Sequence, residues 1–377
     1  MPTRVPSINR RVLTVLVIVA VPILALGARY VVEGGQARAR DAESIQLAQV
    51  AEYIASSTDA YVFRRIVDVA VIARVTEIRR AAAEGSRQPL DQKQIDALDA
   101  EWQKSKKLPP ALSGLLSSPA SRFVADVAKQ DPLYREILVT DRHGRLVAAS
   151  QLTTDYYQAD EGWWEQALDD GRRGRIFVSD VRFDDSAGVY AFDIAVPIAA
   201  PDSDELVGVM KIVASSEELL SGIGGLQLGT TGQAILIRED GSIVYSRQAR
   251  EPGVRFFAAD VLREKLAAMK ENPEERIHFV TRARDGTARV VAVARSQLHK
   301  SFPNLAWLVA VSVADAELLE PFRHVAWSIL VVIGLTTIAV LVVALWASMR
   351  LTRPAIDPAL DLHLVEHAKA HRIDEGE

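Results

Sequence analysis

An apolar run near the C-terminal end places the strongest constraint on this chain. From Val325 to Met349 there are 25 residues without a charge, which is enough to cross a bilayer with some tilt. Trp327 and Trp346 lie near the two ends of the run, where interfacial aromatic side chains are favoured. We therefore expect a transmembrane helix over 325–349, followed by a short, arginine-led cytoplasmic tail over 350–377.

A second apolar segment lies near the N-terminus, and we expect a transmembrane helix over 12–32. Val12 to Gly27 is apolar, and the segment extends to Val32 if Arg29 reaches the interface. Three arginines precede it: Arg4, Arg10 and Arg11. They place residues 1–11 in the cytoplasm by the positive-inside rule. A cleaved signal peptide is the alternative, because small residues end the apolar run. In both cases residues 33–324 lie outside the cytoplasm, and we expect a two-pass protein of the inner membrane.

Composition excludes several functional classes. A net charge of −5 provides no global basic field, so we expect no nucleic acid partner. Cysteine is absent, which excludes disulfides, Cys-based zinc sites and a thiol nucleophile. The string HLVEH (363–367) matches an inverted zinc-protease motif, but too few residues follow it to build a walled site. We expect no enzyme activity, no catalytic or metal site and no cofactor.

The region after the first apolar segment has helical spacing. There is no Pro or Gly from Gln36 to Glu84. Apolar or small residues recur at helical intervals: Leu47, Ala51, Ile54, Thr58, Val62, Ile66, Val69 and Ile72. This pattern predicts a long stalk helix within residues 33–98, and two shorter helices with a kink are the alternative.

Two later segments share one pattern. EILVTDRHGRLVAAS (136–150) and AILIREDGSIVYSR (234–247) each place an alternating apolar strand before an acidic turn that ends in Gly144 or Gly241, then a second strand. Each string predicts a β-hairpin. Since further strand-like runs follow both hairpins, a duplicated α+β unit is the simplest account. We expect a first unit over 99–221 and a second over 222–320.

This layout resembles the double Cache (dCache) sensor domains of bacterial chemoreceptors and sensor kinases. The resemblance covers roughly residues 36–320, and its most specific pieces are DYYQADEGWWEQA, VSDVRFD, YAFDIAVPI, LVGVMKIV and GTTGQAILIREDGSIV. It implies an α+β fold with a long N-terminal helix and two PAS-like antiparallel sheets, flanked by two transmembrane helices. It also implies a homodimer, with the first unit distal to the membrane and the second proximal.

The resemblance places a small-molecule pocket in the distal unit. Tyr156, Trp163 and Asp184 match ligand-holding positions of the amino-acid-binding subgroup, whereas Glu161, Trp164 and Val213 depart from it. These departures argue against an α-amino acid, and an acidic pocket favours a cationic or neutral ligand. The expected ligand-binding residues are Tyr156, Tyr157, Glu161, Trp163, Trp164, Asp180, Arg182, Asp184, Tyr190 and Asp193. The alternative is that the two tryptophans only pin their helix to the sheet.

The expected function is a receptor subunit that signals through the second membrane helix. RLTRPAIDPALDL (350–362) resembles the opening of a HAMP relay helix, with no room for a complete output domain. We therefore expect a separately encoded output protein, a kinase or a chemoreceptor-type protein. A non-signalling binding or assembly protein on a Cache scaffold is the alternative.

Overall fold

The computed structural model describes residues 10–89, 91–169, 173–184, 189–225, 228–247, 254–269 and 276–351. The chain divides into two compact units. One is Asp41–Leu318, and the other combines the chain before Asp41 with the chain from Leu319 onward.

The long helix predicted over the stalk is interrupted. Helix α1 (Arg10–Ile72) has 63 residues, and α2 (Thr76–Arg87) begins after a break in which Val75 is extended, with ψ at 138°. The predicted long helix is therefore confirmed as far as Ile72, and a break follows it because an extended residue cannot continue the helical hydrogen-bond ladder. Helix α3 (Gln92–Ser105) follows, and the Asp91 side chain caps it by accepting the N–H of Gln94. Helix α2 continues through Gly85 as far as Arg87.

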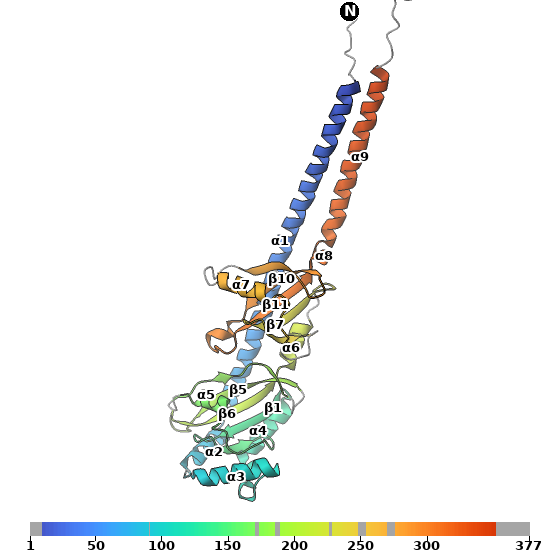
Figure 1. The fold of residues 1–377 in the computed structure, drawn as a ribbon. Coiled ribbons are helices and arrows are strands. Elements are labelled where there is room, and N and C mark those ends of the chain that lie inside the picture. Colours follow the sequence, from blue (N-terminus) through green and yellow to red (C-terminus); the bar gives the residue numbers. More distant parts are fainter. Residues whose placement is uncertain are drawn as a thin grey trace, which may run out of the picture. The chain divides into compact units, whose positions relative to one another are not determined.

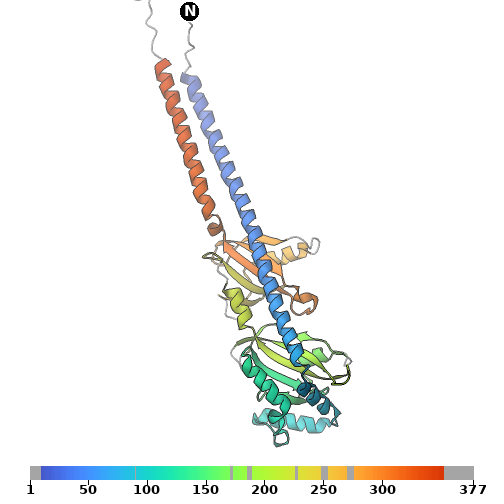
Figure 2. The ribbon, with the colours of Figure 1, turned by 180° about the vertical axis from the view of Figure 1, so that it is seen from behind.

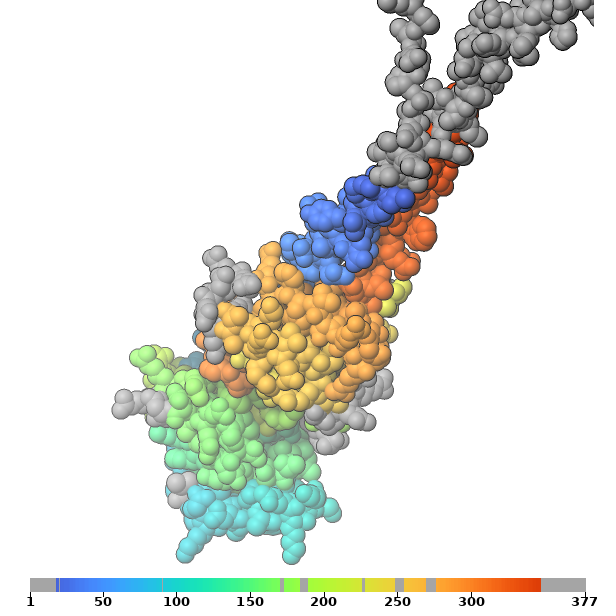
Figure 3. All heavy atoms as spheres, turned by 45° about the horizontal axis from the view of Figure 1, so that its top comes forward, coloured from blue at the N-terminus to red at the C-terminus, as the bar shows by residue number. Residues whose placement is uncertain are grey.

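The first sheet of the Asp41–Leu318 unit is antiparallel, with strand order β2-β1-β6-β5-β3 and β4 paired to β5 (Figure 1). Its strands are β1 (Tyr134–Thr140), β2 (Leu146–Ala149), β3 (Phe177–Val178), β4 (Arg182–Asp184), β5 (Val189–Ala199) and β6 (Leu206–Ser215). Helices α4 (Pro119–Gln130) and α5 (Gly162–Leu168) belong to this half. Figure 3 shows α3 and the turns after it, in cyan, as a layer against this half, in green.

The second sheet repeats the order of the first, as β8-β7-β11-β10-β9. Its strands are β7 (Gln233–Arg238), β8 (Ile243–Ser246), β9 (Ile277–Arg282), β10 (Ala288–Arg295) and β11 (Trp307–Ala314). Helix α6 (Glu217–Gly224) connects the two halves, α7 (Ala259–Met269) packs on the second sheet, and α8 (Asp315–Leu318) follows β11. Both predicted hairpins are confirmed, as β1/β2 and β7/β8.

The duplication extends to the turns. Gly144 and Gly241 have φ angles of 81° and 83°, a region that glycine adopts without steric cost. The carbonyl of Gly144 accepts the N–H of Gln158, and the carbonyl of Gly241 accepts the N–H of Phe256. In both halves, therefore, the chain returns from the hairpin to the glycine turn before it enters a helix.

Each sheet has one face that packs against α1, as Figure 2 shows from behind. Apolar residues of α1, α2 and α4 share one core with alternate strand residues of both sheets, such as Phe192, Ile194 and Val309. We call this the α1 face. The opposite face of the first sheet, which carries Ala195 and Val209, packs against α5, and we call it the α5 face. Alternation along the strands assigns every strand residue to one face or the other.

The helical unit contains the beginning of α1 together with α9 (Glu320–Leu351). Within the described residues, one helical stretch is long and apolar enough to cross a membrane, Glu320–Trp346 of α9. It overlaps the span predicted over 325–349. The second predicted span, over 12–32, stays a prediction. Inside this unit the Phe322 ring lies against Gly35, where a β-carbon would come within 2.4 Å of it.

Candidate functional site

The α5 face of the first sheet carries buried polar side chains. Asp193 on β5 shares this face with Ala195, and Lys211 on β6 shares it with Val209, because alternate strand residues point the same way. Asp193 is 2% exposed and Lys211 is 9% exposed. Charged side chains are almost never buried to this extent without a partner, so the partners of these two identify what the face is for.

Trp164 anchors α5 to the sheet. Its indole Nε1 donates to Thr140 Oγ1 at 3.0 Å, and that hydroxyl donates to the carbonyl of Val209 at 3.1 Å. The ring is 7% exposed. Trp164 therefore has the packing role that the alternative interpretation gave to both tryptophans.

Trp163 is in a different position from its neighbour. It is 6% exposed, and its Nε1 is buried with no hydrogen-bond partner among the described residues. The Lys211 ammonium lies over its ring, 4.9 Å from the centroid. A cation over an indole face is stabilised, but this contact leaves the ammonium protons and the indole N–H without acceptors.

Only one of the two carboxylate oxygens of Asp193 has a hydrogen-bond partner among the described residues. Its Oδ2 accepts from Arg182 Nη2 at 2.8 Å, and its backbone N–H donates to Ser179 Oγ at 2.7 Å. Its Oδ1 is buried and has no partner among the described residues. Trp163, Asp193 and Lys211, which we call the α5-face triad, therefore present two donors and one acceptor that the protein does not use.

Lys211 was missed at the sequence level. It interrupts the apolar string LVGVMKIV, which predicts a buried strand. The lone charge in such a strand was the available signal, since a lysine in a buried strand requires an explanation. Among the described residues Lys211 has no ion pair or hydrogen bond, and its cation–π contact with Trp163 is its one polar interaction.

The tyrosines of the aromatic stretch contribute through their backbone. The N–H groups of Tyr156 and Tyr157 donate to Asp99 Oδ1 of α3, at 2.8 and 3.0 Å. The half-buried Tyr156 ring packs against the core around Trp102. Glu161 is exposed at the start of α5, so it does not take part in the buried triad.

Asp155 is the strongly perturbed carboxyl of this stretch. Burial and the neighbouring Asp99 raise its pKa to about 6, against a hydrogen bond from Gln158 that lowers it. The carboxylates of Glu161 and Asp160 contribute further in the raising direction. The segment before α5 therefore carries a group that titrates in the weakly acidic range.

Two of the predicted residues lie between the two sheets, away from the triad. Asp180 accepts from Arg238 Nε at 2.5 Å and from Trp307 Nε1 at 2.8 Å, both in the second half. Tyr190 shares the α1 face with Phe192 and meets the Tyr245 ring edge-on, with centroids 6.3 Å apart. Their side chains are thus committed to the junction of the sheets. Asp184 pairs with Val189 through its backbone, and its side chain lies outside the described residues.

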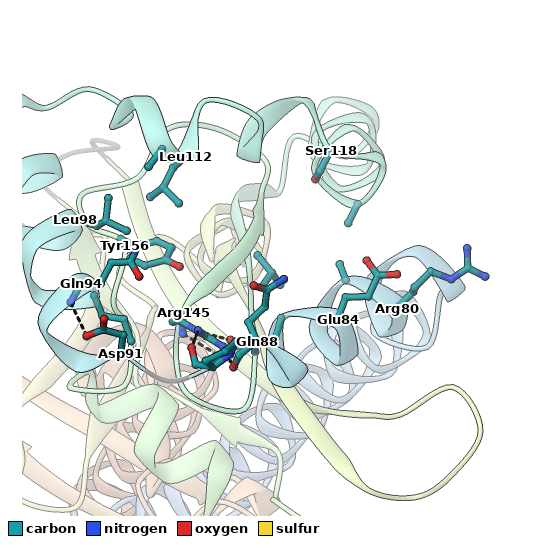
Figure 4. A pocket seen from close by; sticks show the side chains of 18 of the residues that line it. Arg80, Glu84, Gln88, Asp91, Gln94, Leu98, Leu112, Ser118, Arg145 and Tyr156 are labelled. Carbon is teal, nitrogen blue, oxygen red and sulfur yellow. Dashed lines mark hydrogen bonds and ion pairs between the residues drawn. The ribbon is translucent and has the colours of Figure 1, made fainter.

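A separate groove of about 700 Å³ lies between α2, α3 and α4. Figure 4 shows Tyr156, Leu98 and Leu112 at one end of it and Arg80 with Glu84 at the other. Arg145 is within it, but its guanidinium is engaged. It donates to Asp141 Oδ2 at 2.7 Å and to the carbonyls of Gly85, Gln88 and Pro89. This arginine holds the end of α2, which is a structural role.

The described residues contain no group of three or more His, Asp or Glu side chains arranged to hold a metal ion. The string HLVEH at 363–367 lies outside these residues.

The two sheets have the same strand order. Each packs one face along a single long helix, and another helix covers its opposite face. This arrangement defines a tandem PAS-like sensor module. The chain belongs to the Cache domain family, whose dCache model matches residues 36–322. Members of this family are ligand-binding sensor domains of chemoreceptors and kinases, and they are not catalytic.

Several solved structures are similar in fold. The ligand-binding domain of the Pseudomonas aeruginosa PAO1 amino acid chemoreceptor PctC, in complex with GABA, is 15% identical, with 72% of this chain and 99% of that chain covered and a TM-score of 0.45. The ligand-binding domain of the Campylobacter jejuni chemoreceptor Tlp3, in complex with L-norvaline, is 12% identical, with coverages of 73% and 93% and a TM-score of 0.44. No curated protein matches the chain.

Proposed function

We propose that this chain is a membrane-anchored, extracytoplasmic small-molecule sensor whose ligand binds at the α5-face triad. The observation that carries the proposal is the pair of buried, unpartnered atoms Trp163 Nε1 and Asp193 Oδ1, beside the Lys211 ammonium that lies over the Trp163 ring. Leaving a buried donor or acceptor unpaired costs about 1–3 kcal/mol for each group, and more for a charged one. A bound ligand that supplies the missing partners recovers that cost.

The connection from the triad to the second sheet supports a signalling role. Arg182 holds Asp193, and two residues earlier Asp180 is held by Arg238 and Trp307. In addition, Asn304 Nδ2 donates to the carbonyl of Val178 at 2.6 Å. The short segment 178–182 therefore bonds to the ligand-facing Asp193 on one side and to the second sheet on the other.

The second sheet leads directly to the C-terminal helices. Trp307 opens β11, which ends at Ala314 and is followed by α8 and then by α9. In our proposal a change in the segment 178–182 passes along β11 toward α9, which carries the candidate membrane span. A ligand signals in this way only if it binds one of two arrangements more tightly.

The proposed topology keeps the predicted boundaries. It places residues 1–11 and 350–377 in the cytoplasm, spans at 12–32 and 325–349, and the sensor at 33–324 in the periplasm or outside the cell. It also assigns the output to a separately encoded protein. The alternative is an assembly protein whose Cache scaffold binds a protein partner.

An exposed stripe on α1 supports the proposed homodimer. Tyr53, Ala60, Phe63, Val67 and Val71 are exposed and recur at intervals of seven, three, four and four residues. The intervals of seven, three and four from Tyr53 to Val67 fit the spacing of a coiled-coil seam, and the last interval departs from it. Val67→Glu would place a charge in the seam and is expected to turn the dimer into a monomer by light scattering, whereas Arg74→Glu, within the break between α1 and α2, is expected to leave it dimeric.

A thermal-shift screen of the full-length chain in detergent tests the sensor proposal, because a ligand of the folded state raises its melting temperature. Each hit is repeated on Trp163→Phe, which removes the indole N–H but keeps an aromatic ring. Trp327→Phe, in α9, is the matched control. We expect hits that are weakened by the first variant and unchanged by the second. A library without hits, or hits indifferent to Trp163, would instead support the assembly protein.

A further inference from the structure

Lys211 specifies the charge of the ligand. Among the described residues no carboxylate lies within ion-pair distance of it, although it is 9% exposed. The carboxylate of Asp193 is already neutralised on one oxygen by Arg182, at 2.8 Å. Glu136, on the neighbouring strand of this face, has an interaction of its own. The partner that best suits the ammonium of a largely buried lysine is an anion.

Trp163 specifies the geometry of that anion. Its Nε1 is a donor only, and it has no acceptor among the described residues. Lys211 and Trp163 are in contact through the cation–π interaction. One carboxylate, with two oxygens, can accept from the ammonium and from the indole N–H together. Two separate ligand groups would not be needed.

Asp193 requires a hydrogen-bond donor on the ligand, a short distance from the group that binds Lys211. In the β5–β6 ladder Asp193 pairs with Val213 and Lys211 pairs with Ala195, so the two charged residues are diagonal neighbours on one face. Diagonal neighbours have Cα atoms roughly 7–8 Å apart. Asp193 Oδ1 lacks a hydrogen-bond donor. If Lys211 holds the carboxylate of a ligand, a ligand group about two to four bonds from that carboxylate can therefore reach Asp193 Oδ1.

The donor that meets Asp193 is a neutral one. An ammonium at this point would approach two cations, Arg182 and Lys211, while the Asp193 charge is already shared with Arg182. Like charges at close range in a buried site are unfavourable. A hydroxyl supplies the hydrogen bond without that repulsion. The charge balance of the triad therefore suits a monoanion better than a zwitterion.

We propose that the triad binds a small hydroxycarboxylate monoanion, with its carboxylate on Lys211 and Trp163 and its hydroxyl donating to Asp193 Oδ1. This proposal rests on the sensor function proposed above and names its ligand class. It reverses the sequence-based expectation of a cationic or neutral ligand, which counted the acidic residues and overlooked Lys211. It agrees with the expectation that α-amino acids are not the ligands.

Four near-isosteric probes separate these contributions: L-lactate, propionate, lactamide and L-alanine. Each is titrated into the full-length chain by calorimetry, with D-lactate as a stereochemical comparison. We expect L- or D-lactate to bind at least tenfold more tightly than propionate, which lacks the hydroxyl. Lactamide, which lacks the charge, and L-alanine, which carries an ammonium, are each expected to bind at least a hundredfold more weakly than lactate.

Substitutions of Lys211 and Asp193 test which ligand group each side chain contacts. Lys211→Met removes the charge but keeps the length and apolar stem, and it is expected to abolish lactate binding. Lys129→Met, at an exposed position of α4, removes a charge elsewhere and should leave binding unchanged. Asp193→Asn is expected to reduce the preference for lactate over propionate. Melting temperatures without ligand establish that each variant folds, and the discrimination among probes by the unmodified chain does not depend on any variant.

Equal binding of lactate and lactamide, tighter binding of L-alanine than of lactate, or no binding by either lactate would overturn the hydroxycarboxylate proposal. The sensor function has a separate outcome. If L-alanine or a library compound binds and Trp163→Phe weakens it, the triad is still the ligand site and only the ligand class is wrong. If no compound binds at the triad, both proposals fail.

Discussion

The Oδ2 atom of Asp180 lies 2.5 Å from the Nε atom of Arg238, and this ion pair joins the first half of the sensor to the second. The other carboxylate oxygen accepts the indole N–H of Trp307 at 2.8 Å, and Trp307 is fully buried. Both partners lie in strands of the second sheet, whereas Asp180 lies between β3 and β4 of the first. Asp180 was predicted to hold the ligand, but it holds the two sheets together.

Removing the Asp180 carboxylate should destabilise the sensor. Asp180→Ala leaves the buried Trp307 N–H without an acceptor, which costs about 2 kcal/mol and lowers the melting temperature by roughly 5 °C. Asp180→Asn should cost about half as much, because the amide oxygen can still accept from Trp307, while the loss of the partly exposed ion pair adds little. Thermal denaturation followed by circular dichroism measures both.

Asp260 provides the control for this pair of variants. Its side chain is 92% exposed and its partner Arg263 is on the same helix. Asp260→Ala is expected to change the stability by less than about 0.5 kcal/mol. If Asp180→Ala behaved like Asp260→Ala, the bond between the sheets would contribute nothing to stability.

Asp155 should make the sensor less stable as the pH rises. Its pKa is raised in the folded protein to about 6, from an ordinary value of 3.8, so the folded state binds this proton more tightly than the unfolded state. Its contribution is fully present below pH 3.8 and is lost as the pH rises through about 6. Asp155→Asn keeps an oxygen that can accept from Gln158, and it should stabilise the protein above pH 6 by about 1 kcal/mol after solvent screening.

Melting temperatures between pH 4 and pH 7.5 check this prediction for Asp155. The unmodified protein should lose stability across this range relative to Asp155→Asn. Asp126→Asn, on α4, is the control and should follow the unmodified protein. Parallel curves for the unmodified protein and Asp155→Asn would show that the carboxyl titrates as it does in the unfolded chain.

Glu317 should have the opposite pH dependence. Hydrogen bonds from the Thr231 hydroxyl and from the N–H groups of Thr230 and Thr231 hold the pKa of Glu317 at about 2, below its ordinary value of 4.5. The stabilisation is therefore complete above pH 4.5 and is lost as the pH falls toward 2. Glu317→Gln should flatten the loss of stability over this window in acid-unfolding curves, whereas the exposed Glu264→Gln should not.

A pair of glycine substitutions separates backbone strain from steric conflict. Gly144 and Gly286 have φ angles of 81° and 82°. A β-carbon at Gly144 would lie 2.4 Å from Ala159 Cβ, whereas at Gly286 nothing lies within 4 Å. Gly286→Ala should cost about 1 kcal/mol for the left-handed conformation. Gly144→Ala should cost more than twice as much, because the segment leading to α5 must shift. Equal costs by thermal denaturation would contradict the close approach.

The duplicated sheets could be predicted because local signals were sufficient. An acidic turn ending in glycine, between alternating apolar strands, predicted both hairpins, and both have the expected positive-φ glycine. The break in α1 was left as an alternative, because the residues around Val75 carry no proline or glycine to mark it. The packing of α2 against the first sheet is a tertiary effect that the sequence does not display.

The site was predicted less completely, since a linear motif does not show which face of a strand a residue occupies. Trp163 and Asp193 lie on the α5 face, whereas Tyr190 lies on the opposite face and Asp180 bonds to the other sheet. Lys211 was overlooked because it stands alone in an apolar strand. The register that brings Lys211 beside Asp193 comes from the β5–β6 pairing, which no single segment contains.

Hydrogen–deuterium exchange on the full-length chain, with and without the strongest ligand of the thermal-shift screen, tests the central claim most directly. Slower exchange is predicted in α5 and in the facing parts of β5 and β6 around Asp193 and Lys211, together with a change in the segment 178–182. Protection confined to the groove between α2, α3 and α4, with α5, β5 and β6 unchanged, would contradict the claim that the α5 face receives the ligand.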